Sequence, residues 1–359
     1  MQKEYQFPCE KCGAKLKFSV TDGELKCPYC SHINIIKRAF NNIVEKDYYK
    51  TIEMLKNTPK EPLEVTNTKC NSCGAVFDIS EDIHASTCPY CGSDIVNKIE
   101  IYKPIHPQAL LPFKITKDEA RNIFKEWLKN RWFAPNDLKN YSGADSKLKG
   151  IYTPYWTYDS NTFSQYTGRR GDKYYVQEQY TAIVNNQRVL RTRTVEKIRW
   201  SSVSGNLSQS FDDVLVMATS SQKHTLTQWD LENLVDYEEA YLSGYESEVY
   251  SIELDTALGS AKNIMKRHIQ NSIKRQIGGD VQEIDYLKTE YSDITYKHIL
   301  LPIYASAFKF NNKTYSYVIN GRNGEIKGER PYSIIKIIST VLFVVAIIGA
   351  ISYYNEYFG

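Results

Sequence analysis

The 359-residue sequence lacks the motifs that mark the common classes of enzyme. It has no G-K-[ST] for a phosphate-binding loop, no H-E-x-x-H for a zinc protease, no G-x-S-x-G nucleophile elbow and no Rossmann fingerprint. Histidine is scarce, since the six histidines form no pair at helical or strand spacing. We therefore predict that the protein is not an enzyme and expect the purified chain not to hydrolyse nucleotides.

A strong excess of one charge is also missing, because the formal net charge is only +3. The hydrophobic content of 42% and the charged content of 24% are those of a folded protein, which excludes wholesale disorder. The small basic excess would suit an acidic partner such as nucleic acid or a membrane surface. That count, however, treats all eight cysteines as neutral thiols.

All eight cysteines fall in C-x-x-C pairs, and the pairs form two sets of identical spacing. Each set reads C-x2-C-x14-C-x2-C, and the second set begins 61 residues after the first. The eight residues are Cys9, Cys12, Cys27, Cys30, Cys70, Cys73, Cys88 and Cys91. Four thiolates in a tetrahedron suit Zn²⁺ and leave no coordination position for a substrate. We predict two structural zinc ions, one in each four-cysteine zinc ribbon.

Three alternatives to zinc use the same cysteines. Disulfides need an oxidising compartment, and the chain opens without a secretory-signal pattern, so we expect a reducing cytosol instead. Rubredoxin-like iron and a redox dithiol remain open. His32 and His84 lie near the cysteines, but four thiolates already complete each site, so we expect both histidines to be bystanders.

One long hydrophobic run lies near the C-terminus. Residues 337–354 contain no charged side chain, and 18 residues at 1.5 Å per residue extend about 27 Å. Tyr332 precedes this run, and Tyr353 and Tyr354 close it, as in the aromatic belts of membrane proteins. A buried core helix is the alternative, but such a helix rarely needs so long an uncharged run. We predict a transmembrane helix over residues 333–354.

The charges around this segment predict its orientation. Five basic residues precede it and none follows: Lys313, Arg322, Lys327, Arg330 and Lys336. The positive-inside rule then places the N-terminal domains in the cytoplasm and residues 355–359 outside. We expect a single-pass, tail-anchored protein of a bacterial inner (plasma) membrane.

The segment between the ribbons and the anchor predicts a mainly antiparallel β body with packed helices. A capping box at Thr116-x-x-Glu119 begins one helix, and a second runs from about Asp255 to Gly278. Residues 150–220 resemble successive strands with a turn at 168–171, and Asp230 is expected to cap a short helix. A last hairpin turns at Asn311-Asn312.

Two stretches of the body, residues 149–168 and 297–321, share an apolar-Pro-aromatic start and indicate two repeated α+β units. The complete α+β prediction divides the chain as follows: zinc ribbon 1 at 1–36, a helical linker at 37–65, zinc ribbon 2 at 66–98, the body at 99–330 with repeat units at about 110–220 and 250–330, the transmembrane helix at 333–354 and the tail at 355–359.

The stretch RVLRTRTVEKIRW is the most basic in the body. As a strand it would place four basic residues on one face, and two more would lie on the predicted turn nearby: Arg191, Arg193, Lys197 and Arg199, with Arg169 and Arg170. Such a stripe could contact anionic lipid headgroups, RNA or an acidic protein. We favour the simpler interpretation, a solvated sheet face whose charges pair with local carboxylates. The adjacent Asp212 and Asp213 are likewise expected in a turn rather than in a catalytic pair.

Charge also argues against nucleic-acid binding by the ribbons. Residues 66–97 carry one lysine and four acidic residues, and a zinc tetrathiolate adds about −2, so ribbon 2 would have a charge of about −5. Ribbon 1 would be near −1 by the same count. The two sites together change the formal +3 of the chain to about −1.

Several segments in this order resemble a bacterial family of membrane-anchored TFIIB-type zinc-ribbon-containing proteins: CPYCGS, LPFKITKDEA, LKGIYTPYWTYD, YTGRRGD, SGNLSQSFDDVL, YLSGYESEVY, IGGD and LLPIYASAFKF followed by YSYVINGRNGEIKGERPYS. The resemblance covers roughly residues 66–336. Members are often named primosomal protein N′-like or superfamily II helicase, although the present chain has no phosphate-binding loop. Some relatives resemble the membrane partner of an envelope-stress system, which implies an SPFH-domain protein and phage-shock protein A as partners.

The sequence therefore predicts a non-enzymatic, tail-anchored scaffold or adaptor that recruits protein partners at the bacterial inner membrane. The alternative is a membrane-associated nucleic-acid-binding zinc-ribbon protein that uses the arginine stripe. Charge reversal at Arg191, Arg193 and Arg199 would distinguish the two, because only the alternative loses oligonucleotide binding while its protein partners are retained.

Overall fold

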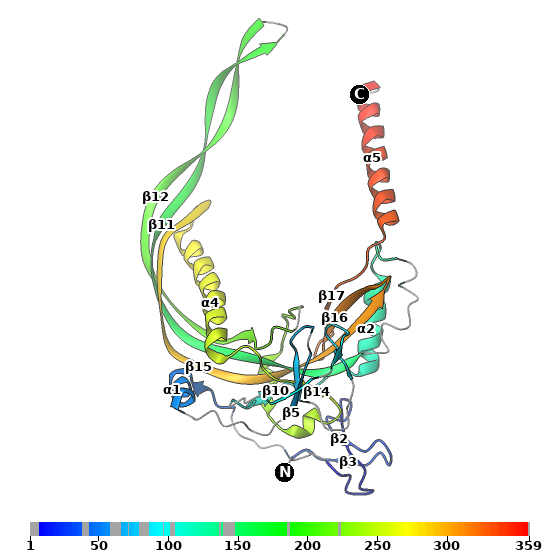
Figure 1. The fold of residues 1–359 in the computed structure, drawn as a ribbon. Helices are drawn as coiled ribbons and strands as arrows, with labels where there is room; N and C mark the ends of the chain where they lie inside the picture. Colours follow the sequence, from blue (N-terminus) through cyan, green and yellow to red (C-terminus); the bar gives the residue numbers. More distant parts are fainter. Residues whose placement is uncertain are drawn as a thin grey trace.

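A computed structural model describes residues 7–37, 43–57, 66–70, 72–78, 86–95, 97–100, 105–135, 138, 148–184, 187–221 and 224–357. The fold is α+β, as predicted, and consists mostly of antiparallel strands (Figure 1). The described residues include four α-helices: α1 (Tyr48–Asn57), α2 (Lys117–Lys129), α4 (Leu254–Ile277) and α5 (Ile334–Tyr357).

The strands and 3-10 turns follow in chain order: β1 (Lys17–Ser19), β2 (Glu24–Lys26), β3 (Ile33–Asn34), β4 (Lys46–Asp47), β5 (Thr66–Lys69), β6 (Val76–Asp78), β7 (Ser86–Thr87), β8 (Asp94–Ile95), β9 (Asn97–Glu100), β10 (Ala109–Leu110), β11 (Lys149–Val184), β12 (Gln187–Met217), η2 (Leu231–Asn233), β13 (Val235–Asp236), η3 (Glu239–Leu242), β14 (Glu246–Glu248), β15 (Val281–Phe310), β16 (Lys313–Asn320) and β17 (Ile326–Gly328).

Three very long strands organise the molecule. β11 pairs antiparallel with β12 along most of its length and with β15 from Lys149 to Gly171. The predicted turn at 168–171 was wrong, because these residues continue β11. The two glycines serve close packing instead: a Cβ on Gly168 would collide with the backbone of β15, and one on Gly171 would meet the side chain of Ile198 at 2.8 Å.

The sheet is bent where all three strands depart from regular pairing. The β11–β12 register shifts between Tyr158 and Ser160, and the β11–β15 register shifts one residue further along. Asp213 and Asp293 both have a φ of 50°, so a bulge lies on each side of β11. Asp212 and Asp213 thus lie at a bulge, which agrees with a turn role. Beyond it, α4 and residues 161–184, 187–210 and 281–292 form an arm that rises from the body (Figure 1).

Lys297 holds this bend together. Its side chain is only 8% exposed, and its Nζ lies 2.9 Å from a carboxylate oxygen of Glu45 and 2.7 Å from one of Asp213. Burial and the hydrogen bond with Glu45 raise the pKa of the nearby Asp159 to about 7. The ammonium group therefore balances a group of carboxylates that would otherwise repel one another.

We expect Lys297→Met to destabilise the fold by about 3 kcal/mol, the lower end for a broken buried ion pair, because both carboxylates keep some solvent contact. Lys288→Met is the matched control, since Lys288 pairs with Glu290 on an exposed part of β15. Its expected cost is below about 0.5 kcal/mol. Urea unfolding of the detergent-solubilised chains compares the two. Equal costs would show that Lys297 does not stabilise the bend.

Local signals predicted the helices well. Thr116 and Glu119 form the expected capping box of α2, and α4 ends at Gly278 as predicted. The turn at Asn311-Asn312 joins β15 to β16, and both asparagines have positive φ. In the linker predicted at 37–65, α1 is a helix of 10 residues, and residues 58–65 lie outside the described residues.

One further prediction about the body needs revision. The short helix expected after Asp230 is the 3-10 turn η2, but the Asp230 side chain does not cap it and instead pairs with Arg322 at 2.5 Å. The stretches 149–168 and 297–321 lie in β11 and β15–β16, where β11 and β15 pair with each other. They are therefore neighbours in one sheet.

The last helix, α5, is exposed to solvent along its apolar length. Residues Ile334–Tyr354 have a mean hydropathy of 2.7, and none of this stretch is buried inside the molecule. Its first turn contacts the body, because the backbone N–H of Ser333 and the Nζ of Lys336 donate to the carbonyls of Phe133 and Ala134. By length and composition α5 could span a membrane.

Candidate metal centres

The four C-x-x-C pairs adopt one repeated loop geometry. In each loop the residue after the second cysteine has positive φ, and its N–H donates to the carbonyl of the first cysteine: Gly13 to Cys9, Ser31 to Cys27, Gly74 to Cys70 and Gly92 to Cys88. Glycine adopts a positive φ without strain at three of these positions, and Ser31 adopts the same conformation at a φ of 57°. Spacing and turn residues are therefore sufficient to shape each loop.

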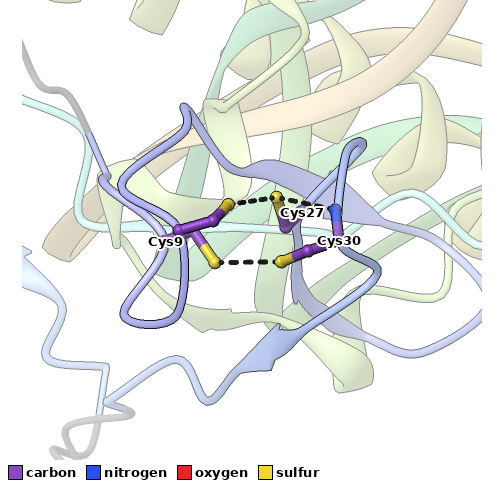
Figure 2. Close-up of side chains that lie close together, drawn as sticks. Cys9, Cys27 and Cys30 are labelled. Carbon is purple, nitrogen blue, oxygen red and sulfur yellow. Dashed lines mark hydrogen bonds between the residues drawn. The ribbon is translucent and has the colours of Figure 1, made fainter.

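The loops bring the predicted ligands together in two clusters. The Sγ–Sγ distances are 3.6 Å for Cys9–Cys30 and 3.5 Å for Cys12–Cys27. In the second cluster Cys70–Cys91 and Cys73–Cys88 lie 3.5 and 3.6 Å apart. Figure 2 shows the sulfur atoms of the first cluster turned toward one another between the two loops.

These distances fit a metal ion better than a disulfide. A disulfide needs about 2.0 Å between sulfurs, and all eight cysteines are free. Bonds of about 2.3 Å from one tetrahedral ion would separate the sulfurs by about 3.8 Å, close to the distances found. Each cluster has its four sulfur atoms within 4.8 Å of one another, so both sets could hold a metal ion.

Hydrogen bonds lower the pKa of one cysteine in each cluster and so favour its thiolate form. The backbone N–H of Cys30 points at the Sγ of Cys27 and lowers the pKa of that thiol to about 6. The hydrogen bond with Cys88 lowers the pKa of Cys73 to about 5. Both clusters thus present a thiolate at neutral pH, the form that binds metal.

The first ribbon is attached to the body by its own small sheet, β1–β2–β3. The Phe18 ring packs edge-on against Tyr241 of η3, and the hydroxyl of Ser243 donates to the carbonyl of Leu16. On its free side this ribbon exposes large apolar side chains. Tyr29, which lies between Cys27 and Cys30, is 82% exposed, and Ile35, which follows this cysteine pair, is 80% exposed.

The second ribbon is part of the main sheet rather than a separate module. β6 pairs with β14, which in turn pairs with β11. Phe77 is fully buried, and Tyr90, which lies between Cys88 and Cys91, is 4% exposed. The Tyr90 hydroxyl donates to a carboxylate oxygen of Glu248 at 2.8 Å. Folding of this cluster and folding of the body are therefore coupled.

Glu248 was missed by the sequence reasoning, because no local signal marks a carboxylate that tertiary packing buries. Its carboxylate also accepts hydrogen bonds from the hydroxyls of Thr219 and Ser221. Burial outweighs these hydrogen bonds and raises the pKa of Glu248 from its ordinary 4.5 to about 7. The folded state consequently binds a proton at Glu248 more tightly than the unfolded chain does.

We expect the chain to lose stability as pH rises from about 4.5 to about 7, and Glu248→Gln to remove about 2–3 kcal/mol of that loss. The sign follows from the raised pKa, since ionising Glu248 costs more in the folded state. Asp159 titrates in the same pH range, so the informative quantity is the difference in the pH dependence of stability between the unmodified chain and Glu248→Gln. Unfolding curves at pH 5 and pH 8 measure it. The same pH dependence in both chains would contradict the assignment.

A third group of possible ligands consists of Glu45, Asp159 and Asp212 at the bend. Lys297 already supplies a positive charge to Glu45, and the Asp159 carboxylate accepts hydrogen bonds from the backbone of Asp213 and the hydroxyl of Thr295. Glu45 and Asp159 thus already have partners within the protein.

The predicted anion-binding arginines lie along the arm, and several are paired. Arg169 contacts Glu283 and Asp285, and Arg170 lies 3.0 Å from Asp172. Arg193 and Lys197 share Glu178, as the solvated-face interpretation predicted. The guanidinium groups of Arg193 and Arg199 lie over Tyr180 and Tyr174, at 5.5 and 5.3 Å from the ring centroids. Covered rings are poor platforms for stacking bases.

Comparison with known proteins gives one distant relative. The chain is 22% identical over 230 residues to a protein of Bacillus subtilis (strain 168) named Uncharacterized protein YdjG. The match covers 63% of the present chain and 64% of that relative, which is less than two thirds of its length. No family model and no solved structure matches the chain.

Proposed function

We propose that the chain is a non-enzymatic scaffold of the bacterial inner membrane, anchored by α5, with two zinc ribbons that shape its protein-binding surface. The observation that carries this proposal is the combination of two four-cysteine clusters with an apolar helix that is not buried inside the molecule. Closed tetrahedral sites hold structure rather than perform chemistry, and such a helix needs a lipid environment.

Zinc is the metal that the ligand set favours, since four thiolates in a tetrahedron suit Zn²⁺. Thiolates require a reducing compartment, and the basic residues before α5 favour a cytoplasmic position of the ribbons by the positive-inside rule. Both arguments are consistent with cytoplasmic ribbons. The family resemblance suggests an SPFH-domain protein and phage-shock protein A as the partners to test first.

Ribbon 1 is the best candidate for partner contact, because ribbon 2 buries its aromatic side chains in the body. The exposed Tyr29 and Ile35 supply apolar contact area on a surface fixed by the metal. Ribbons of net negative charge also favour a protein over a nucleic acid.

A photocrosslinking amino acid at Tyr29 or Ile35 tests this proposal in intact membranes. We expect a discrete set of protein adducts that disappears in Cys12→Ser, because this ribbon needs its metal to keep its shape. The same crosslinker at Ser208, on the exposed part of β12, is the control and should give a different pattern. Absence of adducts from ribbon 1, or nucleotide hydrolysis by the purified chain, would contradict the scaffold.

A further inference from the structure

The outer part of the arm extends beyond its structural support. β15 pairs with β11 only as far as Gly171, and α4 ends at Ile277. Residues 172–184 and 187–199 therefore continue as two strands alone, about 43 Å long at 3.3 Å per residue. A two-stranded hairpin is marginally stable in water, so a surface that binds it would stabilise it.

One face of this hairpin continues the side of the arm that α4 covers. The β11–β12 register has no shift between Ser160 and Val184, so alternate residues of β12 stay on one face throughout. Val203 and Leu207 of that face pack with α4 residues, and Arg191, Arg193, Lys197 and Arg199 continue the same alternation outward.

The exposed side of α4 has the same charge. Residues 256–279 contain five basic and no acidic side chains. Arg170 connects the two elements, because its side chain packs against Gly279 just after α4. We call this surface the basic stripe, and its residues are Arg170, Arg191, Arg193, Lys197, Arg199, Lys266, Arg267, Lys274 and Arg275.

Few of these charges are neutralised locally. Asp172 pairs with Arg170, and Glu178 pairs with Arg193 and Lys197. Among the described residues, no carboxylate forms an ion pair with Arg191 or with the three outer basic residues Lys266, Arg267 and Lys274 of α4. The stripe therefore keeps a large positive excess along the arm.

The tip of the hairpin is apolar as well as basic. Ile183 is 72%, Leu190 64% and Val189 41% exposed. Residues 179–195 contain three arginines and no acidic side chain. Exposed apolar side chains bordered by arginines are typical of segments that lie at the boundary between lipid headgroups and acyl chains.

We propose that the arm binds the anionic headgroups of the leaflet that α5 enters, with the apolar tip at the headgroup boundary and the basic stripe along the surface. The inference rests on the membrane anchoring proposed above. The arm and α5 rise from the same side of the body, so the bilayer lies on the side toward which the arm extends (Figure 1). RNA would use the charge but not the apolar tip, and the tyrosines of the stripe are covered by arginines.

The charges of the hairpin determine how it lies. Lys173, Glu178 and Glu196 keep its stem out of hydrocarbon, so the arm follows the headgroup layer and does not cross it. This position requires α5 to incline away from the arm. Residues 329–333 link β17 to α5, and this movement would break the hydrogen bonds that Ser333 and Lys336 donate to the carbonyls of Phe133 and Ala134.

A fluorescent amino acid at Val189, an exposed tip residue on the same face of β12 as the basic stripe, tests the contact in the full-length chain, reconstituted through α5 into vesicles with brominated acyl chains. We expect blue-shifted, quenched emission in phosphatidylcholine mixed with phosphatidylglycerol, and neither effect in phosphatidylcholine alone. Replacing Arg191, Arg193, Lys197 and Arg199 by glutamine should shift the equilibrium toward the free arm at least about tenfold. The same probe at Ser208, on the opposite face of β12, should remain unquenched.

The outcomes separate this inference from the anchoring on which it rests. A chain that stays in the vesicles with an unquenched Val189 probe, or a quenching unaffected by the glutamine variant, would overturn the arm contact alone. Loss of the chain from the vesicles would overturn the anchoring as well. Competition with an oligonucleotide tests the alternative ligand. If the oligonucleotide displaces the arm from these vesicles at a concentration lower than the concentration of anionic lipid that the arm needs for binding, the stripe is a nucleic-acid site.

Discussion

Replacing Cys88 with serine is expected to unfold ribbon 2 and to lower the unfolding temperature of the body by about 10 °C. Structural zinc contributes on the order of 10 kcal/mol to the folding of small zinc modules, and the ribbon cannot compensate for its loss. Phe77 and Tyr90 would then leave their buried positions against Ile151 and Val318. Exposing two such rings costs the body about 4 kcal/mol.

Cys27→Ser in ribbon 1 is the matched control. It removes the same kind of ligand, but the described residues of ribbon 1 form their own three-stranded sheet and add no strand to the main one. We expect the loss of one metal ion in each variant and less than half of the temperature shift in Cys27→Ser. Calorimetry with metal analysis measures both quantities. Equal shifts would show that ribbon 2 is not coupled to the body through β6 and β14.

Deleting residues 334–359 is expected to move the protein from the membrane to the soluble fraction almost completely. The deletion removes the whole apolar helix, and the remaining body has no comparable apolar segment among its described residues. Deleting only residues 355–359 is the control and should leave the protein in the membrane.

Fractionation is informative only after a wash in about 1 M salt, which screens surface electrostatics and would release an arm bound to headgroups. Retention of the shortened chain after this wash would mean that α5 is not the anchor. If the shortened chain stays in the membrane fraction at low salt and is released only by this wash, the result agrees with an arm that binds anionic lipids weakly once α5 is absent.

Short-range patterns predicted the parts of this fold that short-range physics determines. The cysteine spacing predicted both clusters, since two C-x-x-C loops need only a positive φ after each pair. Thr116 and Glu119 predicted the start of α2, and the uncharged run predicted α5. Each of these signals lies within a few residues of the structure that it determines.

Long-range features could not be predicted in the same way. The glycines at 168 and 171 looked like a turn, because their role as close contacts depends on β15 and β12 lying beside them. The pairing of β6 with β14 and the burial of Glu248 depend on residues more than 150 positions apart. The basic residues of β12 lie on the same face as α4 only because the register of β12 with β11 is uninterrupted, and the sequence does not reveal that register. The lack of acidic residues at 256–279, in contrast, was visible in the sequence.

The most direct test of the account is the metal content of the full-length chain extracted from membranes with detergent. Each cluster brings four cysteine sulfurs close enough together to hold a metal ion, and α5 should bring the intact protein into that fraction. The account predicts two zinc ions per chain, reduced to one in Cys27→Ser and in Cys88→Ser. A membrane fraction without the protein, or a purified chain that contains iron or no metal, would contradict it.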